Sequence, residues 1–279
     1  MRDNGDIIYR EAKMRSNIYS DKNKLNDLTG SEWKFATKSV INKQYPINMQ
    51  HKLRSEHGGQ KPPELCADLI KIFTKEGMNV LDPFMGVGGT LLGASIANRE
   101  AFGIDLNQRW IDIYKEVVRI ENIKEQKTEC GDSLVVLDKL KNESFDFILT
   151  DVPYWNMDAL EKTRNKKVKQ SKLNNFENET EEQSKKEWLN LMKKILSKSV
   201  KKLKKGKYMA IFIGDMYRNS QYHCLSGELA LKLSEIKGLT MKANIVWYDV
   251  SKSLHVFGYP AAYVPSMIHQ NILIFRRDE

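Results

Sequence analysis

Short β-rich apolar runs alternate with amphipathic stretches from about residue 62 to the end of the chain. This alternation is typical of a parallel sheet whose strands are connected by helices. Strands are predicted at residues 78–82, 101–106, 127–131, 145–151, 207–215, 240–249 and 271–276. Helices are predicted at residues 62–75, 90–98, 108–120, 134–140, 180–204 and 226–236. The sequence therefore predicts an α/β fold, a seven-stranded sheet with helices on both faces.

The connection between the last two predicted strands differs from the others. Residues 250–269 are rich in Gly, Pro, Ser and aromatic residues, and no helix is predicted among them. Parallel strands are usually connected by a helix. We therefore expect the final strand to run antiparallel to its neighbours.

Two segments interrupt the alternation. Residues 1–60 are polar and are predicted to form an N-terminal extension, a candidate for contact with nucleic acid. Residues 61–279 are then the main domain. Within it, residues 156–184 form a basic insert after the fourth predicted strand. Loops of this length are usually functional or disordered.

Composition limits the class of protein. With 41% hydrophobic residues and a mean hydropathy of -0.53, the chain is typical of a soluble globular protein. No apolar run approaches the roughly 18 to 20 residues that cross a bilayer, and no secretory signal is evident, so we expect a cytoplasmic protein without a membrane partner. The net charge of +9 favours a polyanionic partner.

The three cysteines are Cys66, Cys130 and Cys224. They stand far apart, without the spacing of metal ligands, so neither a disulfide framework nor a metal site is predicted. We expect all three to be small buried apolar side chains.

A glycine-rich turn follows the first predicted strand, where residues 82–90 read DPFMGVGGT. Glycines allow a tight turn and a close approach to a ligand, and the following helix adds free N–H groups. Asp105 lies near the end of the next predicted strand, where an acidic side chain can accept hydrogen bonds from ribose hydroxyls. The third glycine of dinucleotide-binding turns and the Gly-Lys-Ser/Thr of phosphate loops are both missing. The pattern therefore predicts a nucleoside ligand without a pyrophosphate.

A second signature stands at the end of the fourth predicted strand, where residues 151–154 read DVPY. In this order, the two segments resemble the S-adenosylmethionine-dependent amino-methyltransferases of nucleic acids, whose signatures read DPFxGxG and (D/N/S)PP(Y/F/W). KPPELC at residues 61–66, GDS at 131–133 and HQNILIFR at 269–276 resemble further segments of that family. The resemblance covers residues 59–276 and implies a Rossmann-like methyltransferase sheet.

The resemblance also implies S-adenosylmethionine as the cofactor. In this family pattern, Asp105 would bind the ribose and Asp132 the adenine amino group, while Phe84 would pack against the cofactor. The residues expected to contact the cofactor are Lys61, Asp82, Phe84, Gly86, Gly88, Asp105 and Asp132.

The catalytic residues that the resemblance implies are Asp151, Val152, Pro153 and Tyr154. Methyl transfer to an exocyclic amine is an in-line displacement, so alignment is the main task. The Asp151 carboxylate and the Val152 carbonyl are expected to accept the two amine protons. Tyr154 is expected to stack on a base that has been rotated out of the duplex. The family has proline where Val152 stands, but the carbonyl is retained.

The sequence thus predicts methyl transfer to an exocyclic amino group in duplex DNA, at adenine N6 in preference to cytosine N4, as in restriction–modification enzymes. Two alternatives are an RNA amino-methyltransferase acting on guanine or adenine, and a non-catalytic nucleic-acid-binding partner subunit. The sequence leaves open whether the enzyme binds a partner subunit or forms a homodimer. The side chains of the insert expected to contact DNA phosphates are Lys162, Arg164, Lys166, Lys167 and Lys169.

Overall fold

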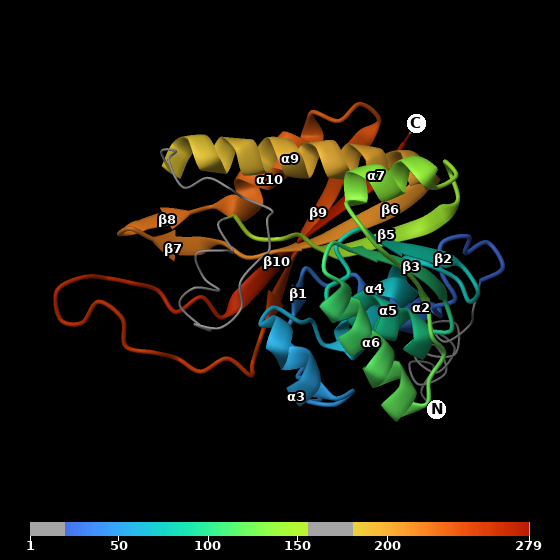
Figure 1. The fold of residues 1–279 in the computed structure, drawn as a ribbon, viewed down its shortest axis with the longest axis horizontal. Coiled ribbons are helices and arrows are strands. Elements are labelled where there is room, and N and C mark those ends of the chain that lie inside the picture. Colours follow the sequence, from blue (N-terminus) through green and yellow to red (C-terminus); the bar gives the residue numbers. More distant parts are fainter. Residues whose placement is uncertain (1–19, 156–180, 279) are drawn as a thin grey trace, which may run out of the picture.

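The computed structural model describes residues 20–155 and 181–278, which form one eight-stranded sheet and a separate two-stranded hairpin (Figure 1). The order in the large sheet is β1-β9-β10-β6-β5-β2-β3-β4. Its strands are β1 (Val40–Ile41), β2 (Asn79–Asp82), β3 (Glu100–Asp105), β4 (Lys127–Cys130), β5 (Phe145–Asp151), β6 (Leu203–Ile213), β9 (Leu239–Tyr248) and β10 (His269–Arg277). All seven predicted strands are present, and the predicted α/β class is confirmed.

Helices cover both faces of the sheet, because neighbouring residues of each buried strand point to opposite faces. Val80 and Phe147 face the helices α4, α5 and α6, whereas Leu81 and Ile148 face α7, α9 and α10. The two sets of helices lie on opposite sides of the sheet in Figure 1. Their bounds are α4 (Pro63–Phe73), α5 (Gly89–Ile96), α6 (Gln108–Glu121), α7 (Ser133–Lys139), α9 (Glu181–Lys202) and α10 (Leu225–Ser234).

The final strand is antiparallel, as the sequence predicts. β10 lies between β9 and β6 and pairs antiparallel with both. β5, β2, β3 and β4 pair in parallel, as do β5 and β6. The first residues of β10 therefore lie beside the carboxyl ends of the parallel strands. The hairpin consists of β7 (Met216–Arg218) and β8 (Gln221–His223), directly after β6.

The N-terminal extension contributes the eighth strand, which the sequence analysis did not predict. β1 pairs in parallel with β9 over only two residues, too short a run for a periodic pattern. The other elements in the described part of the extension, residues 20–60, are α2 (Gly30–Ala36), α3 (His51–Arg54) and a 3₁₀ turn, Ser55–His57. The buried Asn26 donates to the Ile72 carbonyl at 2.6 Å, and Asp27 pairs with Arg99 at 3.2 Å. These contacts attach the extension to the main domain.

The expectation of three buried cysteines is correct only for Cys66. Cys130 ends β4 and Cys224 precedes α10, and both are exposed, because the strand end and the helix start lie at the surface. No helix within the described ranges is long and apolar enough to cross a membrane.

Candidate active site

Three carboxylates stand at the carboxyl edge of the sheet. Asp82, Asp105 and Asp151 are the last residues of β2, β3 and β5, which are neighbouring parallel strands. The chain continues from β2 to β3 on one side of β2, whereas β5 lies on its other side. This reversal is a topological switch point, the usual place for a ligand in an open α/β sheet.

The glycine-rich turn between β2 and α5 needs left-handed backbone at two positions. Gly86 has φ +51° and Gly88 has φ +80°, a conformation that favours glycine. A Cβ on Gly88 would lie 2.3 Å from the Tyr114 ring, so packing as well as backbone requires glycine there. The Gly86 N–H donates to Asp105 Oδ2 at 2.9 Å, which joins the turn to the end of β3.

The carboxylates beside this turn have unusual protonation properties. Burial raises the pKa of Asp82 to about 7, although it accepts hydrogen bonds from Thr150 at 2.6 Å and from the Phe84 N–H at 3.0 Å. Burial also raises the pKa of Asp105 to about 6, although hydrogen bonds from the N–H groups of Asn107 and Gly86 lower it. A cationic ligand would relieve the cost of burying Asp82 and Asp105. Asp132, by contrast, is exposed and caps α7 by accepting from the Leu134 N–H at 2.8 Å.

Lys61 contacts Asp151, a pair that the sequence analysis did not predict. The Lys61 side chain is 6% exposed, and its ammonium group forms an ion pair with Asp151 Oδ2. It also donates to the Gly59 carbonyl at 3.2 Å. The expectation from the family resemblance was a cofactor contact. In the structure, Lys61 holds the first residue of the amine signature.

The second oxygen of Asp151 has unused hydrogen-bonding capacity. Among the described residues, Asp151 Oδ1 is buried and has no hydrogen-bond partner. Burial raises the pKa of Asp151, and the neighbouring Lys61 ammonium partly opposes this shift. Lys61 thus favours the ionised carboxylate, which accepts hydrogen bonds at both oxygens.

The other residues of the DVPY segment have different surroundings. The Tyr154 hydroxyl accepts from the Gly214 N–H at 3.0 Å and from the Gln270 amide at 2.8 Å, which fixes the ring at a pocket wall. Val152 is buried in the core. The Pro153 carbonyl accepts from Trp188 Nε1 at 2.8 Å. Of these three residues, Tyr154 alone lines the pocket.

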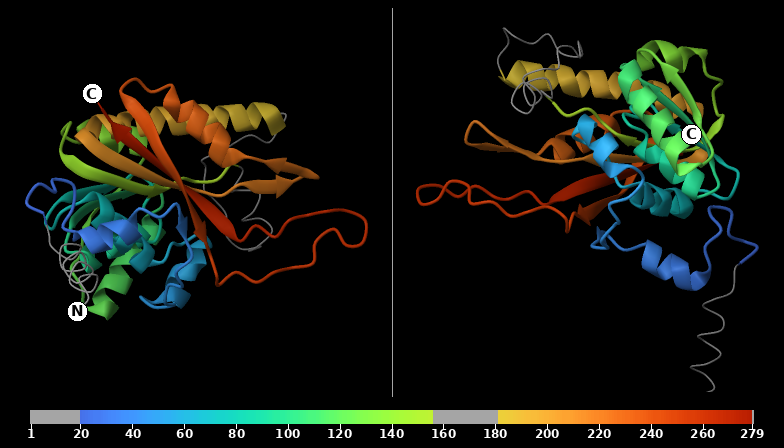
Figure 2. Two further views of the ribbon diagram at one scale, coloured as in Figure 1. Left: turned by 180° about the vertical axis from the view of Figure 1, so that it is seen from behind. Right: turned by 60° about the horizontal axis from the view of Figure 1, so that its bottom comes forward.

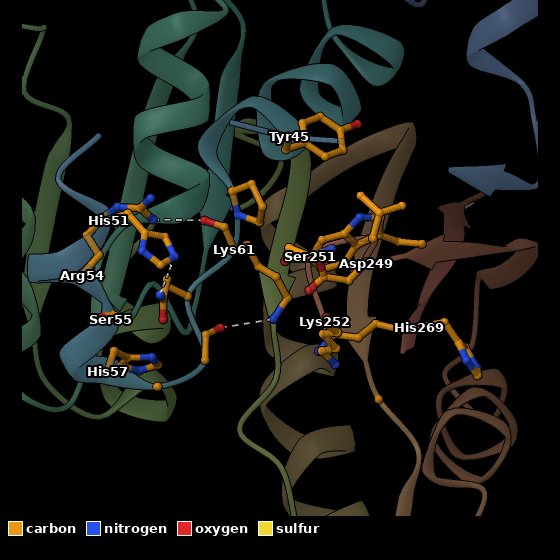
Figure 3. Close-up of a pocket in the computed structure, with 18 of the residues that line it drawn as sticks. Tyr45, His51, Arg54, Ser55, His57, Lys61, Asp249, Ser251, Lys252 and His269 are labelled. Atoms are coloured by element: carbon orange, nitrogen blue, oxygen red, sulfur yellow. Dashed lines mark hydrogen bonds between the residues drawn. The ribbon is translucent and has the colours of Figure 1, made fainter. Parts of the chain in front are cut away.

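This pocket has a volume of about 720 Å³, within the usual range for small-molecule sites. Its walls come from the extension, from Tyr154, and from the residues that follow β6, follow β9 and begin β10. In Figure 3, Lys61 lies between His57 and the loop that carries Asp249 and Lys252. The pocket thus includes Lys61, the ion-pair partner of Asp151, whereas Asp151 itself is not among its lining residues.

His57 is a residue of this site that the sequence analysis missed. Its ring packs edge-on against Trp110, with centroids 5.0 Å apart, and a Cβ on Gly86 would lie 3.0 Å from His57 Nε2. Burial and the nearby Lys61 lower the pKa of His57 to about 4, so the ring is neutral. The sequence shows only a loop-like HGGQ, which does not indicate that the imidazole covers the glycine turn.

The predicted DNA contacts Lys162, Arg164, Lys166, Lys167 and Lys169 lie outside the described residues.

Comparison with known proteins identifies the family. The sequence profile of the N6/N4 family, described as DNA methylase, matches residues 3–116 and 145–279. The chain belongs to this family. Its cofactor is S-adenosylmethionine. The residues around the glycine turn fit this cofactor, because a sulfonium cation and an adenosine suit the carboxylates of Asp82 and Asp105.

Curated relatives match parts of the chain. The type II methyltransferase M.HpaI of Haemophilus parainfluenzae is 33% identical over 93 residues, 32% of this chain and 30% of that protein. The tRNA (guanine(10)-N2)-dimethyltransferase of Pyrococcus abyssi is 26% identical over 110 residues, 39% of this chain and 33% of that protein. The matched region thus spans about a third of the length of these relatives.

Solved structures support the fold. TrmN from Thermus thermophilus superposes with a TM-score of 0.53 and 14% identity, over 85% of this chain and 55% of that chain. At this identity the likeness extends to the fold alone.

We expect Asp105 to make cofactor binding dependent on pH. The ionised carboxylate can accept further hydrogen bonds, and it is lost as the pH falls through about 6. We therefore expect affinity for S-adenosylmethionine to fall by up to about 10-fold per pH unit below that value. Asp105→Asn should remove this dependence, as calorimetry between pH 5 and 8 can measure. Asp112→Asn, at an exposed position on α6, is the matched control. An unchanged profile in Asp105→Asn would exclude Asp105 as the source.

Proposed function

We propose that the protein transfers the methyl group of S-adenosylmethionine to an exocyclic amino group in DNA, at adenine N6 in preference to cytosine N4. The observation that carries the proposal is the Asp151 carboxylate. One of its oxygens is bound by Lys61, and the other is buried and unpartnered among the described residues, three residues before the pocket-lining Tyr154. The DNA methylase family and the likeness to M.HpaI support DNA as the substrate.

In the proposed reaction, the chain orients and activates the amine. The cofactor supplies an electrophilic methyl group on its sulfonium. Asp151 Oδ1 and the Val152 carbonyl accept the amine protons and free the nitrogen lone pair. As the N–C bond forms and the C–S bond breaks, positive charge develops on nitrogen, and the Asp151 carboxylate stabilises it. The carboxylate can then take the proton that the nitrogen releases.

Tyr154 is proposed to bind the target base. Its hydroxyl is held by Gly214 and Gln270, so its ring is fixed before the substrate arrives. A fixed ring loses little conformational entropy when a flipped base stacks on it. The Lys61 ammonium favours the ionised form of Asp151.

A second candidate is methylation of a guanine or adenine amino group in RNA, favoured by the match to the tRNA (guanine(10)-N2)-dimethyltransferase. A third is a non-catalytic partner subunit, for which Val152 in place of the family's proline is the argument. The Oδ1 of the Asp151 carboxylate, unpartnered among the described residues, favours a catalytic protein over a non-catalytic partner subunit.

One experiment separates the three candidates. Labelled S-adenosylmethionine is incubated with duplex DNA, with tRNA or with no acceptor. We expect label in DNA, and digestion to nucleosides should then identify N6-methyladenine. Label in N4-methylcytosine would correct the base, label in tRNA would replace DNA as the substrate, and label in neither acceptor would support the partner subunit.

A further inference from the structure

A long arm, residues 249–268, connects β9 and β10 and projects beyond the sheet (Figure 1). Both views in Figure 2 also show it extending away from the body, on the same side as the β7–β8 hairpin. Its two limbs are held together near the base, where the Asp249 N–H donates to the Ile268 carbonyl at 2.9 Å. Farther out, the Ser266 hydroxyl donates to the His255 carbonyl at 3.1 Å. The arm thus has a defined hairpin-like path.

The outer part of the arm exposes apolar and aromatic side chains. Val256, Tyr259 and Tyr263 are 84%, 82% and 87% exposed, the three highest values among the large hydrophobic side chains of the described residues. Leu254 and Phe257 are also exposed. A projection with this composition buries little of its own surface, and a cluster of this kind usually marks an interaction site.

The charge of the arm suits a polyanionic partner. Residues 250–268 include Lys252 and contain no Asp or Glu. The complete chain has a net charge of +9. A DNA strand that runs along the arm would therefore meet no carboxylate from residues 250–268.

The base of the arm forms part of the candidate active site. Asp249, Ser251, Lys252 and Met267 line the same pocket as Tyr154. A molecule that places a base in this pocket would therefore lie next to the base of the arm. The exposed aromatic side chains are thus continuous with the surface on which the target base is proposed to bind.

We propose that the arm is a DNA-binding element, in which Tyr259 and Tyr263 stack on bases next to the target nucleotide. This inference rests on the proposed function. Extracting a base from the duplex leaves its neighbours unstacked, and aromatic rings can replace the lost contacts. Stacking tolerates any base, so the arm supplies affinity and assists base flipping, whatever sequence is recognised.

The test removes the two rings. Tyr259→Ala/Tyr263→Ala should weaken binding to a short fluorescein-labelled duplex of random sequence by roughly 10-fold for each ring, measured by anisotropy. The salt dependence of binding should stay unchanged, because stacking neutralises no phosphate. Tyr259→Phe/Tyr263→Phe keeps the rings and should bind as wild type. Duplexes containing 5-bromouracil should crosslink to the arm in wild type and in the Phe variant.

A matched control removes exposed apolar surface elsewhere. Leu231→Ala on α10, another highly exposed side chain, should leave DNA affinity unchanged. Unchanged affinity in the double alanine variant would overturn the inference. So would a change from dimer to monomer in that variant at wild-type DNA affinity, because the arm would then be a contact between copies of this chain.

The two proposals fail in different ways. If wild-type protein methylates no DNA, the proposed function is wrong. If wild type methylates DNA and the double alanine variant does so with the same KM, only the role of the arm is wrong. Cofactor affinity should be equal in all four proteins, since none of the substituted residues, Tyr259, Tyr263 and Leu231, lines the pocket.

Discussion

Asp151→Ala should lower kcat for methyl transfer by about 10²- to 10³-fold, the usual effect of removing one group that stabilises developing charge. The carboxylate is the proposed acceptor for the amine proton, and its Oδ1 is buried without a partner among the described residues. Affinity for S-adenosylmethionine should stay nearly unchanged, because Asp151 acts on the amine and not on the donor. Single-turnover transfer and calorimetry measure the two quantities separately.

The control for this variant follows from the ion pair. Asp151→Ala leaves the buried Lys61 ammonium uncompensated, which should lower the free energy of unfolding by about 3 to 5 kcal/mol. Replacing both partners in Lys61→Met/Asp151→Ala should recover much of that stability, since a buried pair can be exchanged for apolar groups at little cost. Turnover should remain as low as in Asp151→Ala. Recovery of turnover together with stability would show that Asp151 has a structural role only.

The position of the three carboxylates at strand ends could be predicted, because the apolar pattern of each strand and the parallel topology of the sheet agree. Residues 145–151 were predicted as a strand and form β5 with the same bounds, since an apolar run there ends at a proline-containing turn. Parallel strands place their carboxyl ends at one edge. Asp82, Asp105 and Asp151 could thus be assigned to one edge of the sheet from sequence alone.

Other features could not be predicted because their causes are not local. β6 begins at Leu203, directly after α9, while the prediction began at residue 207. The early part of β6 is only partly buried and reads as polar. Similarly, β1 exists only because β9 provides an edge for it. In both cases the tertiary neighbour, not the sequence pattern, determines the strand.

Within the site, the ion pair of Lys61 with Asp151 is the clearest example of a feature that the sequence does not predict. Lys61 and Asp151 are 90 residues apart, and no periodicity specifies which carboxylate a lysine meets. The buried Arg54 fixes the segment through the Lys61 carbonyl at 3.1 Å and the Met49 carbonyl at 2.8 Å. These contacts direct the Lys61 side chain to Asp151. They belong to the extension, whose polar sequence gave no indication of a precise structure.

Lys61→Met should lower kcat at neutral pH by roughly 10- to 100-fold, the loss expected when a charge-assisted hydrogen bond is removed. Burial already raises the pKa of Asp151, and the Lys61 ammonium opposes that shift. Without Lys61, the pKa of Asp151 rises further. The ionised carboxylate is the working form, so activity is lost as the pH falls through this pKa. The acidic limb of the kcat profile should therefore move to higher pH in Lys61→Met.

The shift of the acidic limb distinguishes two roles for Lys61, holding Asp151 and binding the cofactor. If Lys61 holds Asp151, activity in Lys61→Met should recover partly as the pH rises, Lys61→Arg should keep a profile close to wild type, and cofactor affinity should change little. Lys193→Met, which breaks the surface pair of Lys193 with Glu235, is the matched control and should keep the wild-type profile. If Lys61 instead binds the cofactor, Lys61→Met should weaken S-adenosylmethionine binding and leave the acidic limb in place, because the protonation of Asp151 would not depend on it.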